Sequence, residues 1–242
     1  MLCAVPPVAG ASLPQASWRV LFEDDSLVIV SKDAGLLTVP GIGEEKADCL
    51  ISRLNGAGFP EIEFAPHRLD RDTSGLIALG RTAKAHKSLA TAFQDRKVFK
   101  RYEALCFGWP QDDSGAVDMA IGKLRLPGTR HAVMRVDGPG VEKARPSLTE
   151  WQVLERCTAA DSTRFARVAL TPVTGRAHQL RVHMAYLGHP ILGDELHGNE
   201  ASTAVATRLC LHAAELRLPH PVSGEEVRVQ SDVDWSKVVP WR

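Results

Sequence analysis

The stretch that decides the fold of this chain is His67-Arg68-Leu69-Asp70-Arg71-Asp72-Thr73-Ser74-Gly75-Leu76. It places Asp70 between two arginines and then reaches a Thr-Ser-Gly turn that precedes a short apolar strand. Cationic neighbours favour the charged form of a carboxylate, so Asp70 could attack a carbon or remove a proton while the arginines hold a polyanion. The same residues would also make an ordinary surface loop with exposed ion pairs. A second motif is needed to choose between these interpretations.

That second motif is TGRAHQLRVHM at residues 174–184, which continues into LGHPILGD at residues 187–194. Together the two stretches resemble the RluA-type pseudouridine synthases, which isomerise uridine in ribosomal and transfer RNA. Members of that family carry an HRLD-x-x-TSG segment and, further along, GR-x-HQLR-x-H followed by GHPILGD. The similarity continues at residues 20–41, 100–102 and 209–213, so it covers nearly everything from about residue 19 onward. Agreement of five ordered segments disfavours the surface-loop interpretation.

Length and composition limit the classes of protein that need to be considered. A chain of 242 residues can bury one sizeable core, and 44% hydrophobic and 24% charged residues are typical of a soluble protein. No apolar run approaches the roughly 20 residues that cross a bilayer, so we expect no membrane partner. The five cysteines are scattered without a C-x-x-C pair, which disfavours a disulfide framework and a structural zinc site and fits a reducing cytoplasm.

The chain reads as one catalytic domain preceded by a short tail. Residues 1–18 are rich in Pro, Ala and Ser and contain no Lys or Arg, which disfavours a secretory signal and predicts a flexible N-terminal tail. Residues 19–242 are predicted to form a single pseudouridine synthase catalytic domain. No separate RNA-binding module is recognisable, so the default expectation is a monomer.

The net charge is zero, which by itself disfavours a nucleic-acid partner, but the charges are unevenly distributed. Residues 67–101 contain nine Lys or Arg against three Asp, and residues 123–145 contain six against two acids. A neutral protein with such a basic face can still follow an RNA backbone, with binding that weakens as salt rises. Charges spread around a solvated surface are the alternative.

The periodicity of apolar residues predicts an α+β fold on a mixed, mostly antiparallel central sheet flanked by helices and loops, as the resemblance also implies. Strands are expected within residues 19–31 and at residues 75–80, 98–107 and 164–173, with a hairpin joining 216–218 to 227–229. Helices are expected at residues 46–54, at 83–95 after the cap Thr82, and along the apolar spacing of Leu180, His183, Met184 and Leu187. Gly188 would end this last helix.

The resemblance implies an RNA pseudouridine synthase, an isomerase, with Asp70 as its catalytic carboxylate. The bond between the ribose and nitrogen 1 of the uracil must break, the ring must turn, and a new bond must form between the ribose and carbon 5. Nothing is oxidised and no group is gained or lost, so we expect no cofactor. Asp70 would either attack the anomeric carbon or remove the 2′ proton, and the sequence does not choose between these routes.

The resemblance also assigns roles to Arg181 and Tyr102. Arg181 matches the arginine that pairs with the catalytic acid; a structural salt bridge would predict the same contact. Tyr102 matches the family's active-site tyrosine, which can stack on the uracil and is placed to take the carbon-5 proton. A tyrosine at the sheet surface is the alternative.

Five residues are candidate RNA contacts. Arg68 corresponds to the arginine that fills the gap left by a flipped base. Arg71, Arg176, His178 and Gln179 are candidate contacts to phosphate, ribose or base, although His178 and Gln179 could equally be structural. His178, His183 and His189 have a spacing that fits no zinc motif, so we expect no metal site and a buried structural role for His183.

Two other classes of function remain as alternatives. The first is a non-catalytic RNA-binding or RNA-remodelling protein of the same fold, which would have no need of Asp70, Tyr102 and Arg181 together. The second is a glycosidase, which commonly uses two flanking acids, whereas Asp72 is the only other acid close in sequence. The partner is expected to be ribosomal or transfer RNA and not DNA.

Overall fold

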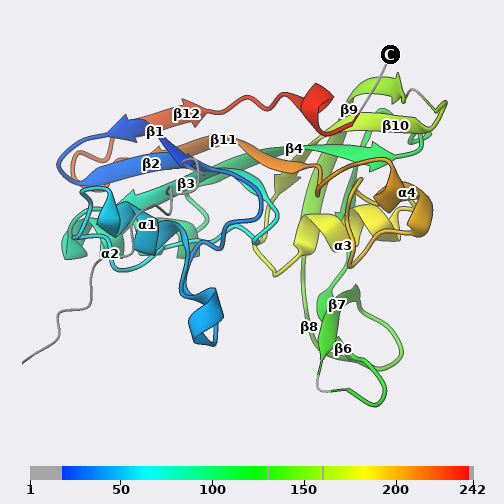
Figure 1. The fold of residues 1–242 in the computed structure, drawn as a ribbon, viewed down its shortest axis with the longest axis horizontal. Coiled ribbons are helices and arrows are strands. Elements are labelled where there is room, and N and C mark those ends of the chain that lie inside the picture. The colour runs from blue at the N-terminus through cyan, green and yellow to red at the C-terminus, as the bar shows by residue number, and fades with distance from the viewer. Residues whose placement is uncertain (1–17, 130, 160, 240–242) are drawn as a thin grey trace, which may run out of the picture.

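The computed structural model describes residues 18–239 except 130 and 160, so the expected tail lies outside the described residues apart from Trp18, which begins the first strand. The described chain forms a long sheet of nine strands, a small sheet of three strands, and short helices (Figure 1). None of the described helices is both long and apolar enough to cross a membrane.

The strands of the long sheet run in the order β1-β2-β3-β11-β4-β10-β9-β5, and β12 pairs with β11. Only the pairing of β3 with β11 is parallel among the described strands, which confirms the mixed, mostly antiparallel α+β fold. The strand bounds are β1 Trp18–Glu23, β2 Leu27–Lys32, β3 Ser74–Gly80, β4 Phe99–Phe107, β5 Ser114–Asp118, β9 Leu148–Thr158, β10 Arg164–Pro172, β11 Leu211–Pro219 and β12 Glu226–Gln230.

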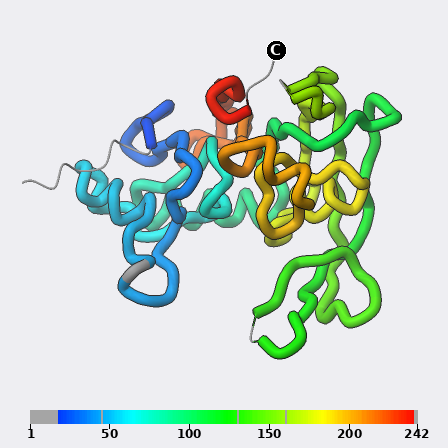
Figure 2. The backbone as a smooth tube through the Cα atoms, turned by 45° about the vertical axis from the view of Figure 1, so that its right-hand side comes forward, coloured from blue at the N-terminus to red at the C-terminus, as the bar shows by residue number. Residues whose placement is uncertain are grey.

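The remaining elements lie around this sheet. Figures 1 and 2 show the small sheet projecting from the same side of the long sheet as α1, α2 and α3. Its strands are β6 Ile121–Arg125, β7 Ala132–Val136 and β8 Val141–Arg145, paired in the order β7-β6-β8. The helices are α1 Leu50–Gly56, α2 Ala83–Gln94, α3 Gln179–Tyr186 and α4 Glu200–Ala204, with single 3-10 turns η1 Glu44–Lys46 and η2 Trp235–Lys237.

Local sequence signals account for most of these boundaries. Asp24 turns the chain between β1 and β2 because its Oδ1 accepts hydrogen bonds from the amides of Ser26 and Leu27. Thr82 caps α2 through the amide of Ala85, as predicted. Gly188 follows α3 with a φ of 83°, which a side chain would disfavour.

The prediction of a helix at residues 46–54 is wrong about where the helix begins. Residues 44–46 form only the turn η1, and α1 begins at Leu50. Cys49 is extended, with a φ of −154°, because it forms a bridge with Leu37. It then caps α1 reciprocally with Ser52, in an arrangement where cysteine takes the place of the usual serine or threonine.

The core consists of two apolar clusters that meet at Tyr102. The first cluster joins β2 and β3 to α1 and α2, and includes Ile29, Leu50 and Leu79. The second joins β4 and β10 to α3 and the segment after it. The half-buried ring of Tyr102 packs against both, so β4 lies where the two halves of the molecule meet. The candidate site opens at this junction.

Candidate active site

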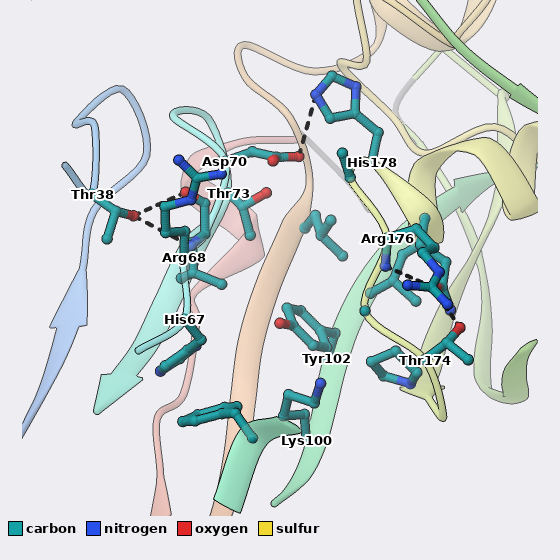
Figure 3. A pocket seen from close by; sticks show the side chains of 18 of the residues that line it. Thr38, His67, Arg68, Asp70, Thr73, Lys100, Tyr102, Thr174, Arg176 and His178 are labelled. Carbon is teal, nitrogen blue, oxygen red and sulfur yellow. Dashed lines mark hydrogen bonds and ion pairs between the residues drawn. The ribbon is translucent and has the colours of Figure 1, made fainter. Parts of the chain in front are cut away.

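A pocket of about 1300 Å³ opens where the two halves of the core meet. It is lined by the loop of residues 66–73 before β3, called here the Asp70 loop, and by residues 173–178 before α3, called here the Arg176 loop. Figure 3 shows the two loops facing one another across Tyr102. Its described lining includes two carboxylates, Asp70 and Asp72, and seven cations: Arg68, Arg71, Arg96, Lys97, Lys100, Arg176 and Arg181. Such a pocket favours an anionic ligand.

Hydrogen bonds to the backbone hold the Asp70 loop on both sides of Asp70. Before Asp70, the Thr38 hydroxyl accepts from the Leu69 amide at 3.2 Å and donates to the Leu69 carbonyl at 2.9 Å. After Asp70, the Arg71 carbonyl accepts from the Gly35 amide at 2.9 Å and from Lys32 Nζ at 3.0 Å. With both neighbouring peptides held, the loop has little freedom to move the Asp70 carboxylate.

Lys32 is the charged residue among these anchors, and burying its ammonium group has an energetic cost. Its side chain is fully buried, and Nζ also donates to the carbonyls of Asp33 and Leu36. Burial lowers the pKa of Lys32 to about 8, while the nearby Asp72, Asp33 and Asp70 act in the opposite direction. The lysine therefore joins residues 32–36 to the Asp70 loop through three carbonyl groups.

The Thr-Ser-Gly stretch is predicted to form a turn, but Ser74 and Gly75 already belong to strand β3, where they contact β11. Gly75 has a φ of 110°, and a Cβ at this position would overlap the backbone of Ala213. The Ser74 hydroxyl also lies 2.8 Å from Nδ1 of His212 on β11, and the direction of this hydrogen bond depends on the tautomer of His212. The close approach of the two backbones is what brings the Asp70 loop to β11 and the adjacent β4.

The Arg176 loop is held mainly through the side chain of Gln179. Its Oε1 accepts from the Thr174 hydroxyl at 2.7 Å and from the Arg176 amide at 3.0 Å. Its Nε2 donates to the Leu148 carbonyl at 2.9 Å and to the Thr149 hydroxyl at 3.0 Å. The amide is buried and all its hydrogen-bonding capacity is used within the protein, which favours the structural alternative left open for Gln179.

Arg181 connects α3 to two carboxylates. It donates through Nε and Nη2 to both oxygens of buried Asp194, at 2.7 and 2.6 Å, and through Nη1 to Oδ2 of Asp70 at 3.3 Å. Burial would raise the pKa of Asp194, but the hydrogen bonds and charge of Arg181 outweigh that effect and lower it. The contact between Arg181 and Asp70 is therefore present, with Asp194 orienting the guanidinium from the other side.

His178 faces the same oxygen of Asp70. Its Nε2 lies 3.9 Å from Asp70 Oδ2, as the dashed line in Figure 3 marks. Its Nδ1 is 2.8 Å from Nε2 of His197, and burial lowers the pKa of His178 despite the opposing charge of Asp70. His178 also has a φ of 55°, which is uncommon for a residue with a side chain. Asp70 Oδ1 has no partner among the residues that the structure describes.

Tyr102 and Lys100 form the floor of the pocket on β4. Figure 3 shows both side chains between the two loops, with Tyr102 on the Asp70 side of Lys100. Burial, and then the charge of Asp70, raise the pKa of the Tyr102 phenol well above its usual value. Burial lowers the pKa of Lys100, whose Nζ reaches the edge of the Arg176 loop near Gly175. The phenol is thus neutral and the lysine faces the pocket.

The three candidate arginines are arranged around the opening. Arg68 is exposed and makes no ion pair with a described residue. Arg71 is also exposed and pairs with Asp72 at 2.9 Å. Arg176 is half-buried and donates to the Pro146 carbonyl at 3.3 Å. All three guanidinium groups line the pocket and can reach a bound polyanion.

The structure also locates residues that had no assigned role in the sequence. Asp194 was quoted only as the end of a motif, while His197 and Arg135 belong to no recognisable motif. His183 is a fully buried histidine that contacts the Thr149 hydroxyl at 2.9 Å and the Met119 carbonyl at 3.0 Å, as expected of a structural residue. No group of three or more metal-ligating side chains occurs among the described residues.

Comparisons with known proteins agree with this geometry. A sequence model of the RNA pseudouridylate synthase family matches residues 26–186. The dual-specificity RNA pseudouridine synthase RluA of Escherichia coli strain K12 is 40% identical over 223 residues, covering 92% of this chain and 96% of the relative. The protein of the same name from Vibrio parahaemolyticus is 40% identical over 211 residues, covering 87% and 81%.

Solved structures show the same likeness. Human RNA pseudouridylate synthase domain containing 1 superimposes with a TM-score of 0.79 and 29% identity, covering 95% of this chain and 91% of that protein. Human RNA pseudouridylate synthase domain containing 4 superimposes with a TM-score of 0.67 and 25% identity, covering 89% and 88%.

Proposed function

The chain belongs to the RNA pseudouridylate synthase family, and from this premise we propose that Asp70 is the carboxylate that acts on the ribose of the target uridine. The protein is therefore an enzyme, an isomerase whose substrate is RNA. The observation that carries the assignment of Asp70 is its place in a basic pocket, between two peptides held by hydrogen bonds.

The contacts of Asp70 support different roles for its two carboxylate oxygens. Arg181 donates to Oδ2 and His178 faces it, so Oδ2 stays oriented as an acceptor. Oδ1 has no described partner and is the oxygen that would meet the substrate. The charge of Arg181 stabilises the carboxylate as an anion in a pocket that a bound uridine would close to water.

The reaction itself requires no group beyond those of the site. The bond from ribose to nitrogen 1 breaks, the bond to carbon 5 forms, the proton of carbon 5 leaves, and nitrogen 1 gains a proton. Oδ1 would either attack the anomeric carbon or remove the 2′ proton, and both routes begin with an ionised carboxylate at the sugar. Arg181 serves each route equally because it contacts the opposite oxygen.

Tyr102 is assigned to the uracil ring. Its place on β4 at the pocket floor allows the phenol ring to stack on a flipped base. The raised pKa disfavours a standing phenolate, so its hydroxyl is assigned to a hydrogen bond near carbon 5 rather than to a negative charge. A neutral phenol can take part in proton removal only if its own proton moves at the same time.

The basic lining is assigned to the RNA backbone and to the gap in the base stack. Flipping a base costs a few kcal/mol, which contacts from the protein can offset. Arg68 is exposed at the opening and is assigned to the gap, whereas Arg71 and Arg176 are assigned to phosphates. Lys100 extends this set into the pocket, next to the Arg176 loop.

The substrate is assigned to uridines in ribosomal or transfer RNA stem-loops, as the resemblance to the RluA-type synthases implies; two relatives are named as dual-specificity RNA pseudouridine synthases. We assign this activity to one catalytic domain of residues 19–242 that acts as a monomer on RNA and not on DNA or membranes. The described cysteines are free thiols, which is consistent with a cytoplasmic location.

Pseudouridine mapping tests this assignment and identifies the target. Total ribosomal and transfer RNA from cells lacking the gene would be treated with the purified protein and mapped by carbodiimide-dependent primer-extension stops. We expect the wild type to restore a missing stop. Asp70→Asn removes the charge but keeps the shape, so we expect a loss on the order of 10²- to 10⁴-fold with RNA binding preserved.

Asp72→Asn is the matched control, since it removes the same charge from the same loop at a residue whose ion pair is with exposed Arg71 and whose charge acts on Lys32 without a hydrogen bond to it. We expect this variant to retain turnover. Turnover by Asp70→Asn would remove Asp70 from its role. Equal RNA binding by both proteins with no change at any uridine would instead favour a non-catalytic RNA-binding protein, and release of free uracil would indicate a glycosidase.

A further inference from the structure

The contacts of Asp70 continue outward through two histidines to the small sheet. Nδ1 of His178 lies 2.8 Å from Nε2 of His197, and Nδ1 of His197 lies 2.9 Å from Nη1 of Arg135. Arg135 belongs to β7, whereas His197 follows α3 and is held through its amide by Oδ1 of Asp194 at 3.0 Å. A line of hydrogen bonds therefore joins the small sheet to the catalytic side of the pocket.

The directions of these hydrogen bonds follow from the residue types. A guanidinium can only donate, so Nδ1 of His197 must accept from Arg135 and carry no proton. Burial lowers the pKa of His197 to about 4, so the ring is neutral near pH 7 and its single proton is on Nε2. That nitrogen then donates to Nδ1 of His178.

The same reasoning sets the tautomer of His178. Because Nδ1 accepts from His197, the proton of a neutral His178 is on Nε2, the nitrogen that faces Oδ2 of Asp70 at 3.9 Å. The left-handed backbone at His178, with φ 55° and ψ 17°, directs the ring toward the pocket at the start of α3. The opposite tautomer would place a lone pair against the carboxylate.

We propose that Arg135 and His197 are positioning residues that fix the tautomer of His178, so that its Nε2–H faces Oδ2 of Asp70 and leaves Oδ1 for the substrate. This inference rests on the proposed role of Asp70. It gives the small sheet a part in catalysis besides any contact with RNA, because Arg135 acts through two rings on the orientation of the reacting carboxylate.

Nitrogen-15 spectra of the histidine side chains test the tautomers directly, without RNA and without turnover. At neutral pH we expect His178 and His197 each to show a protonated Nε2 and a bare Nδ1. Arg135→Met removes the donor at similar length, so we expect a mixture of tautomers at both rings. Arg135→Lys keeps an obligate donor and should restore the wild-type pattern.

Kinetics separate a positioning role from a phosphate contact. We expect Arg135→Met to lower the single-turnover rate at saturating RNA by about 10- to 100-fold, as when an outer partner of an active-site histidine is removed, with partial recovery in Arg135→Lys. Arg125→Met is the control, because exposed Arg125 lies on the neighbouring β6 and pairs with Glu142 rather than with a histidine. Its histidine spectrum should match the wild type, and any loss should be confined to KM.

Three results would overturn this proposal, and a fourth would refute the proposed function instead. A proton on Nδ1 of His178 or His197 in the wild type, or unchanged tautomers in Arg135→Met, would overturn the proposal even if Asp70 is catalytic. So would an Arg135→Met variant whose only defect is a KM increase equal to that of Arg125→Met. Turnover by Asp70→Asn would instead refute the proposed function while leaving the measured tautomers as they are. If Arg135→Met fails to fold, the wild-type spectrum still decides, because a proton on Nδ1 of either His178 or His197 would overturn the proposal.

Discussion

The Asp70 loop and the Arg176 loop face one pocket, but the contacts that hold them are distributed differently. In the Asp70 loop, peptide groups on both sides of the acid are held by three separate residues, Thr38, Gly35 and Lys32. In the Arg176 loop, four hydrogen bonds converge on the side-chain amide of Gln179, two with hydroxyls and two with backbone groups. The reacting acid is therefore held at several independent points, whereas the loop that faces it depends largely on one side chain.

Arg181 links the two halves of the core. Its Nη1 contacts Asp70 of the first half, while its Nε and Nη2 both donate to Asp194, which belongs to the second half like Arg181 itself. Arg181 thus makes one longer contact, of 3.3 Å, across the junction and two short ones, of 2.7 and 2.6 Å, within the second half. A substitution of Arg181 should therefore disturb the stability of the second half and the chemistry of the first together.

The largest effect is expected for Arg181→Met. It leaves the buried carboxylate of Asp194 without its cation, which should cost about 3–5 kcal/mol of unfolding free energy and abolish measurable turnover. Arg181→Lys keeps the charge but not the two-pronged geometry, so an intermediate loss is expected. Urea unfolding and single-turnover assays measure the two effects. An Arg181→Met protein as stable as the wild type would show that Asp194 does not depend on this pair.

Sequence patterns predicted the strands of the long sheet better than the contacts that hold the residues of the candidate site. The helix α2, the hairpin of β11 and β12, and the pairing of Arg181 with Asp70 all follow from local signals or from the resemblance. The small sheet, the role of Lys32 and the placing of His197 beside His178 were not predicted. These depend on contacts between residues far apart in the chain, for which periodicity and motif spacing carry no signal.

Lys32→Met tests how far the Asp70 loop depends on its anchors. Three carbonyl groups lose a charged donor, so we expect the unfolding free energy to fall by about 1–3 kcal/mol and kcat to fall with it. Lys84→Met on the exposed face of α2 is the control and should change neither. If Lys32→Met lost stability but kept kcat, the loop would hold Asp70 in place without this lysine, and the comparison of the two loops would weaken.

Stability is also expected to depend on pH through buried histidines that support each of the two loops. His212 supports the Asp70 loop through Ser74, and His197 supports His178 beside the Arg176 loop. Burial lowers the pKa of each to about 4, whereas an unfolded histidine titrates near 6.5. Between these values the unfolded chain binds more protons than the folded one, so stability rises with pH.

Each histidine should add about 1.4 kcal/mol per pH unit to that slope over the window from about 4 to 6.5. Urea unfolding across the window measures it, and His212→Gln and His197→Gln should each reduce the slope by the same amount. Only His197→Gln should also disturb the tautomer of His178. A slope unchanged in both variants would mean that other groups govern acid sensitivity. A change in only one would show that the two halves unfold separately, because a single cooperative unit counts every buried histidine wherever it lies.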